Sequence, residues 1–188
     1  MKKRTIIPAL LLLVILSGCV CSREPVAVVY GKRIYYSDLD PDHMGESLSE
    51  QIHGPVIRKY LHERGLTVSD KELIAFVKDG DEPVPDDILD KEGKIFFRAI
   101  LESNLFAKSL FDEYGGRVTI SSFGFIGALD AQEKFLRKLI QEGKLSILDP
   151  ALEQKFWETV TNEWGDSTLS EEKAREMFND PDYPLGLS

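Results

Sequence analysis

A long helical pattern constrains the fold more than any other feature of this sequence. It begins at about Asp87 or Lys91 and runs to Tyr114, with apolar residues at steps of three and four along one face. A second apolar stripe lies beside the first and consists of Phe97, Leu101 and Leu105. A helix that is apolar on two sides must be enclosed by other elements or offer one side to a partner, so we expect the domain to be built around it.

Further helical patterns flank this segment and predict a mainly α fold. One follows Ser37 and Asp38 and ends at Gly65, and Pro55 inside it either opens a second segment or kinks a continuous helix. A capping box over residues 69–72 begins another helix. Towards the C-terminus we expect three more helices, over about 128–142, from the Asp149-Pro150 start signal, and from Ser170 to about Phe178.

Short β-rich stretches predict a small number of strands. Residues 26–36 are rich in β-branched and aromatic residues on both sides of Gly31, which favours a strand or a hairpin with a tight turn. One or two further short strands are expected, at 117–123 and at 145–148.

The N-terminus has the composition of a secretory signal. Three basic residues at 2–4 precede an apolar run from Ile6 to Leu16, and small residues follow at Ser17 and Gly18. The alternative, a transmembrane anchor, requires about 20 apolar residues, whereas this run has eleven and contains Pro8. We therefore expect residues 1–18 to be a cleaved signal peptide.

The end of this signal resembles the lipobox of bacterial lipoproteins. In that pattern Leu16, Ser17 and Gly18 are recognised by the signal peptidase, and Cys19 is the lipid attachment site. Two or three acyl chains such as palmitate form an effectively permanent anchor, whereas one chain binds a membrane only marginally. Cys21 does not fit the pattern when the preceding residues are read back from it, so we expect it to be a free thiol.

The mature chain is expected to consist of a lipidated tether (19–25), one helical domain (26–180) and an irregular tail (181–188). Removal of the signal leaves 20 basic and 32 acidic residues, a net charge of −12. This charge argues against nucleic acid as a partner and against electrostatic docking on anionic lipid. The lipid is then the membrane contact, and Val20 in place of aspartate favours the outer membrane over the inner one, with the domain facing the periplasm.

Sequence patterns for catalysis, metals and cofactors are missing. His43, His53 and His62 lack metal-ligand spacing, and we expect each to be a surface or partly packed residue. Asp38, Asp40 and Asp42 begin like a calcium loop, but the later positions of such a loop do not follow, so we interpret them as carboxylates at a helix start. No nucleophile elbow or phosphate-binding loop appears, and we expect no enzyme and no cofactor.

Two motifs carry a resemblance to a known family. Residues 26–34 with Ser37-Asp38-Leu39, and then residues 65–73, resemble the two signatures of the N-terminal domain of SurA-type and PrsA-type chaperones, which belong with the parvulin-like peptidyl-prolyl isomerases. The resemblance covers about 26–114. Tyr30 stands where the family usually has asparagine before the glycine, and the chain has no room for the isomerase domain.

The resemblance implies a chaperone-like module that holds unfolded or exported polypeptides without isomerase activity. The stripe of Phe97, Leu101 and Leu105 is then the expected peptide-binding surface. An alternative of another class is an accessory or structural lipoprotein that docks on one envelope complex. A third hypothesis, an isomerase, requires a measured prolyl isomerisation, which we do not expect.

Overall fold

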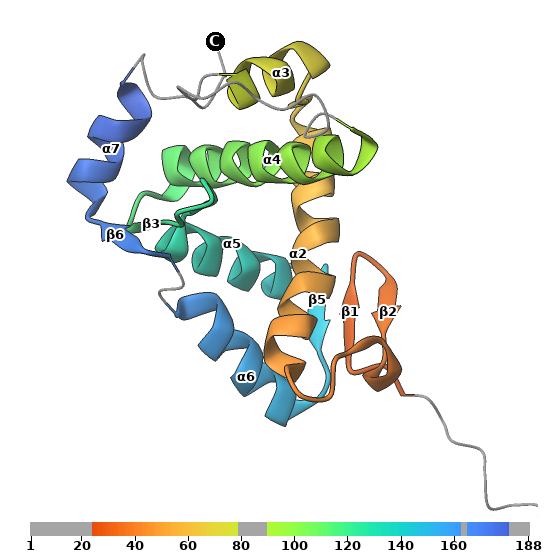
Figure 1. Ribbon diagram of the computed structural model, residues 1–188. Coiled ribbons are helices and arrows are strands. Elements are labelled where there is room, and N and C mark those ends of the chain that lie inside the picture. The colour runs from red at the N-terminus through yellow and green to blue at the C-terminus, as the bar shows by residue number, and fades with distance from the viewer. Residues whose placement is uncertain (1–23, 79–89, 163–164, 181–188) are drawn as a thin grey trace, which may run out of the picture.

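The computed structural model describes residues 24–78, 90–162 and 165–180. Figure 1 shows a mainly helical protein with two small antiparallel sheets. Several predicted features lie outside the described residues. They are the signal peptide, the lipobox with Cys19, the thiol of Cys21, and the tail from 181.

The first sheet is formed by the N-terminal hairpin and one strand from much later in the chain. Strands β1 (Ala27–Val29) and β2 (Lys32–Ile34) are joined by Tyr30 and Gly31, whose φ angles are 49° and 83°. Two successive positive φ angles are the geometry of a type I′ hairpin turn. On its other side β1 pairs with β5 (Leu145–Ile147), and Ala27 lies opposite both Ile34 and Ile147.

A long helix follows a short 3-10 turn. The expected helix start at Ser37 and Asp38 is instead this turn (Tyr36–Asp38), in which the Asp38 carboxylate accepts a hydrogen bond from the backbone N–H of Tyr35 (2.9 Å). Helix α2 (Met44–Glu63) then runs through Pro55 without interruption. It ends as predicted, because Gly65 adopts a φ of 65° directly after the C-cap residue.

Local capping signals define the next two helices. Helix α3 (Asp70–Lys78) begins with the predicted capping box, in which Ser69 and Glu72 each accept a hydrogen bond from the other's backbone N–H (3.2 and 2.6 Å). Helix α4 (Lys91–Tyr114) is the long helix, and the Asp90 carboxylate caps it by accepting from the N–H groups of Glu92 and Gly93. Of the two predicted starts, Lys91 is therefore correct.

The second sheet has β3 (Val118–Ile120) at its centre. The strand β4 (Ile126–Gly127) pairs with one edge of β3, and β6 (Ser167–Leu169) pairs with the other. The described residues thus contain four strands beyond the hairpin, and the expectation of one or two was too low. Both missed strands form by pairing with β3, and no alternation within their own residues indicates that pairing.

The remaining helices are α5 (Leu129–Gln141), α6 (Pro150–Thr161) and α7 (Glu171–Asn179). Asp149 caps α6, and Ser170 caps α7. In Figure 1, α2 crosses the end of α4 and runs down beside α6, while α5 lies below α4. One cluster of buried apolar residues spans these helices and both sheets. Within the described ranges, no helix combines the length and apolar character that crossing a membrane requires.

The hairpin turn generates a test of backbone strain. Gly31→Ala should lower the free energy of unfolding by about 1 kcal/mol, because φ is 83° there and no atom lies within 4 Å of the added methyl group. The matched control is Gly54→Ala inside α2, where the methyl group meets only the end of Arg58 and should stabilise by up to about 1 kcal/mol. Urea unfolding of both variants measures the difference, and equal effects would contradict the assigned turn.

Candidate functional site

A pocket of about 480 Å³ opens between α2, α4, α5, α6 and β4. Its lining is mainly apolar, and the apolar side chains come from α2, α4, α6, β4 and the turn that precedes β4. The apolar lining residues are Ile57, Phe106, Ala107, Phe125, Ile126 and Val160. Polar side chains line the remainder, and they include Ser49 and His53 of α2, Gln132 of α5, Ser103 of α4 and Thr159 of α6. A volume of this size and a mainly apolar lining with a few convergent polar groups are typical of small-ligand or side-chain binding sites.

His53 is the central polar group of this pocket. Its Nδ1 is 2.9 Å from Ser49 Oγ, one turn earlier on α2, and its Nε2 contacts the side-chain amide nitrogen of Gln132. A neutral ring satisfies both contacts when Nδ1–H donates to Ser49 and Nε2 accepts from Gln132. Desolvation by the surrounding protein lowers the pKa of His53 to about 4, and hydrogen bonding at Ser49 opposes the shift only in part. The ring is therefore neutral at pH 7.

The Ser49–His53 pair lacks the features of a nucleophilic site. Ser49 is only 6% exposed, and the partner of Nε2 is an amide rather than a carboxylate. A histidine whose pKa is about 4 is also a weak base at neutral pH. The Ser49–His53 pair therefore lacks the arrangement that acyl transfer requires.

The rim of the pocket carries two carboxylates, Glu46 and Glu50. They lie one turn apart on α2, both are exposed, and neither forms an ion pair with a described residue. A shallower depression beside the pocket shares Glu46 and Thr159 with it. Asp42, Glu158 and Lys155 also line that depression, so this flank has a net negative charge.

A tight turn between β3 and β4 forms one border of the pocket and is held by the buried Asn104 of α4. The Asn104 amide donates to Gly124 O and its oxygen accepts from Ile126 N–H, both at 2.9 Å. The turn is closed by hydrogen bonds between Ser121 and Phe125 and by the bond from the Ser122 backbone N–H to the Asp166 carboxylate. Asn104 thereby fixes the position of Phe125 at the pocket.

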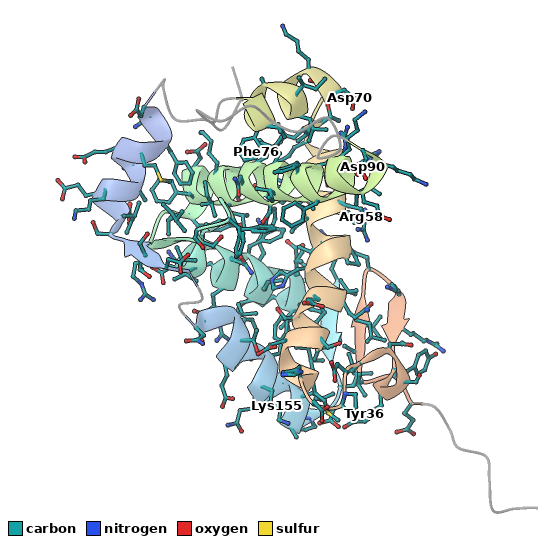
Figure 2. The ribbon with its side chains drawn as sticks, viewed as in Figure 1. Tyr36, Arg58, Asp70, Phe76, Asp90 and Lys155 are labelled. Carbon is teal, nitrogen blue, oxygen red and sulfur yellow. The ribbon has the colours of Figure 1, made fainter. Side chains whose placement is uncertain are left out.

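An aromatic surface, in which two rings are exposed and three are half-buried, continues from the pocket across this turn to α3 and α4. We define it as Phe76, Phe96, Phe97, Phe123 and Phe125. The ring centroid of Phe96 is 5.4 Å from that of Phe97 and 6.2 Å from that of Phe125, and Phe97 is 6.4 Å from Phe76. Phe96 is 49% exposed and Phe123 75% exposed. Figure 2 shows Phe76 between α3 and α4.

The predicted peptide-binding stripe is only partly at the surface. Phe97 belongs to the aromatic surface and is half-buried, but Leu101 and Leu105 are only 2% and 7% exposed. These two residues are part of the core, because α2, α3, α5 and β4 pack against α4 and bury them. Assigning peptide contacts to Leu101 and Leu105 is therefore wrong for this structure, and the exposed apolar surface lies at the first turns of α4 instead.

The pocket residues were not predicted from the sequence. His43 and His62 are exposed and His53 is partly buried, as expected for surface or partly packed histidines, but nothing in the spacing of His53 indicated a cavity. The sequence did contain a signal for Asn104, since a polar residue within the apolar face of a helix indicates a buried hydrogen bond. Among the described residues no group of histidine, cysteine and acidic side chains is arranged to hold a metal ion. Asp40 instead accepts from the Asp42 N–H within its own turn.

No family model, curated protein or solved structure matches this chain.

The shifted pKa of His53 predicts how stability depends on pH. Between pH 6.5 and 4 the unfolded chain binds a proton at His53 that the folded chain does not bind, so stability falls as the pH falls through this window. Relative to His53→Gln, the wild type should lose about 1 to 2 kcal/mol of unfolding free energy between pH 7.5 and pH 5. Urea unfolding at the two pH values measures this loss. A difference that is independent of pH would contradict the lowered pKa.

The Asn104 bridge generates a second prediction. Asn104→Ala should reduce the free energy of unfolding by about 2 kcal/mol or more, because it leaves two buried backbone groups of the turn without partners. The neighbouring Ser103→Ala is the control, since Ser103 forms no such bridge, and it should change stability by about 0.5 kcal/mol or less. Chemical denaturation of both variants gives the comparison, and equal losses would show that the bridge is dispensable.

Proposed function

We propose that this chain is a lipid-anchored, periplasm-facing chaperone-like protein that holds unfolded or exported polypeptides without isomerase activity and without a cofactor. The observation that carries the proposal is the aromatic surface, which places exposed phenylalanine rings beside an open apolar pocket. Large aromatic side chains that gather at the surface are typical of binding sites for apolar segments of other proteins.

The expected strength of binding suits reversible holding. Burying a fully exposed phenylalanine side chain against a client contributes about 1.5 to 3 kcal/mol. Phe96 is 49% exposed and Phe123 is 75% exposed, so the two rings together contribute about 2 to 4 kcal/mol before the client's ordering cost. Energies of this size correspond to dissociation constants in the millimolar range or weaker, in which clients exchange readily.

The turn that presents Phe123 and Phe125 is fixed by Asn104 and Asp166. Because the turn is already ordered, little conformational entropy is lost when a client binds to it. The hairpin and capping-box motifs, which resemble the N-terminal domain of SurA-type chaperones, support the same class of function. The lipobox supports attachment at the membrane, with the outer membrane favoured.

The exposed rings provide a direct test of holding activity. The double variant Phe96→Ser/Phe123→Ser should lose most of its ability to suppress aggregation of an unfolded outer-membrane protein, because the apolar contact surface is removed. Light scattering at several chaperone concentrations measures the suppression. Leu148→Ser is the matched control, since Leu148 is 55% exposed and lies beside the start of α6. Equal activity of all three proteins would contradict the proposal.

Photo-crosslinking from positions 96 and 123 in cells distinguishes this function from the accessory-subunit alternative. Crosslinks to many exported polypeptides are expected of a chaperone-like protein. One partner recovered in a fixed ratio would instead assign the chain to an envelope complex as an accessory lipoprotein.

A further inference from the structure

The pocket beside His53 combines an apolar interior with an acidic rim. Glu46 and Glu50 both line it and lie four residues apart on one face of α2. Like charges at this spacing destabilise a helix, and neither carboxylate forms an ion pair with a described residue, although Lys155 lines the neighbouring depression with Glu46. A positive charge from outside the chain removes this repulsion.

The interior of the pocket suits an apolar group. Ile57, Phe106, Phe125 and Val160 form much of its wall, and its volume of about 480 Å³ is large enough for an aromatic or long aliphatic side chain. Phe125 belongs both to this wall and to the aromatic surface, where its ring lies 6.2 Å from that of Phe96. A polypeptide that lies on the aromatic surface therefore reaches the pocket directly.

The interior does not repel a nearby cation. The polar groups inside are the hydroxyls of Ser49, Ser103 and Thr159, the amide of Gln132 and the imidazole of His53, which is neutral because its pKa is about 4. The flank beyond Glu46 is also acidic overall, since Asp42 and Glu158 outnumber Lys155 there. Figure 2 shows Lys155 on α6, at the end of the molecule where α2 begins.

We propose that the pocket receives an apolar side chain of a client polypeptide while Glu46 and Glu50 bind a lysine or arginine beside it. The proposal rests on the proposed holding function and adds a preference to it. Clients with basic residues next to apolar ones are selected over neutral or acidic clients. Charge complementarity at the rim supplies this preference, whereas the apolar contacts supply most of the affinity.

Two labelled peptides of equal length and equal apolar content test the preference. In one peptide a lysine follows each phenylalanine, and in the other a glutamine does so. Fluorescence anisotropy with the full-length protein in detergent should give about tenfold tighter binding of the lysine peptide at low salt, and added salt should reduce that difference.

The variant Glu46→Gln/Glu50→Gln should bind both peptides equally. Glu172→Gln/Glu176→Gln is the matched control, because it removes the same charge from exposed positions on α7, away from the pocket. It should retain most of the preference for lysine. A preference that survives in the rim variant, or that disappears equally in the control, overturns the proposal.

Filling the pocket tests the apolar part of the site. Ser103→Trp places a large side chain at the wall of the pocket and should weaken both peptides, with a folded circular dichroism spectrum as the check on structure. Unchanged binding of both peptides to this variant overturns the assignment of the pocket. Failure of the proposed function gives a different result, in which neither peptide binds the wild type and aggregation is not suppressed.

Discussion

The packing of Tyr60 against two phenylalanine rings holds the three central helices together. Its ring centroid lies 5.0 Å from that of Phe106 and 5.2 Å from that of Phe135, both in edge-to-face geometry. The phenol hydroxyl is hydrogen-bonded to Ser109 Oγ (2.9 Å), so the ring is buried without an unsatisfied polar group. The Arg64 guanidinium covers its outer face at 3.6 Å. Because Phe106 also lines the pocket, this cluster determines where α2 and α4 form the pocket wall.

Much of the helical framework could be predicted because its signals are local. Several helix boundaries are determined by residues within one turn of them, so the sequence around each such boundary contains the whole signal. Examples are Asp149-Pro150, the capping box at Ser69 and the glycine at 115. The strands β4 and β6 were missed for the opposite reason. Their few residues become strands only because β3 lies between them, and that pairing depends on tertiary structure.

The site could be predicted only in part for a related reason. Periodicity shows that Leu101 and Leu105 are apolar, but it does not show which helix covers them, and the neighbours of α4 decide that. The pocket joins residues between 46 and 160 of the sequence, so no single stretch contains its pattern. Asn104 is an intermediate case. An amide among apolar residues of a helix indicates that it hydrogen-bonds a buried backbone group, but the sequence does not show which group that is.

The order of strands in the two sheets bears on how the chain acquires its structure as it is synthesised. In each sheet the middle strand precedes its last partner by many residues in the sequence. Strand β1 pairs with β5 at residues 145–147, and β3 pairs with β6 at residues 167–169. Closing such long loops is entropically costly and slow. A chain that emerges from its N-terminus therefore completes neither sheet until its C-terminal third has followed. Until then β1 lacks its partner β5 and β3 lacks its partner β6, so one edge of each central strand stays open.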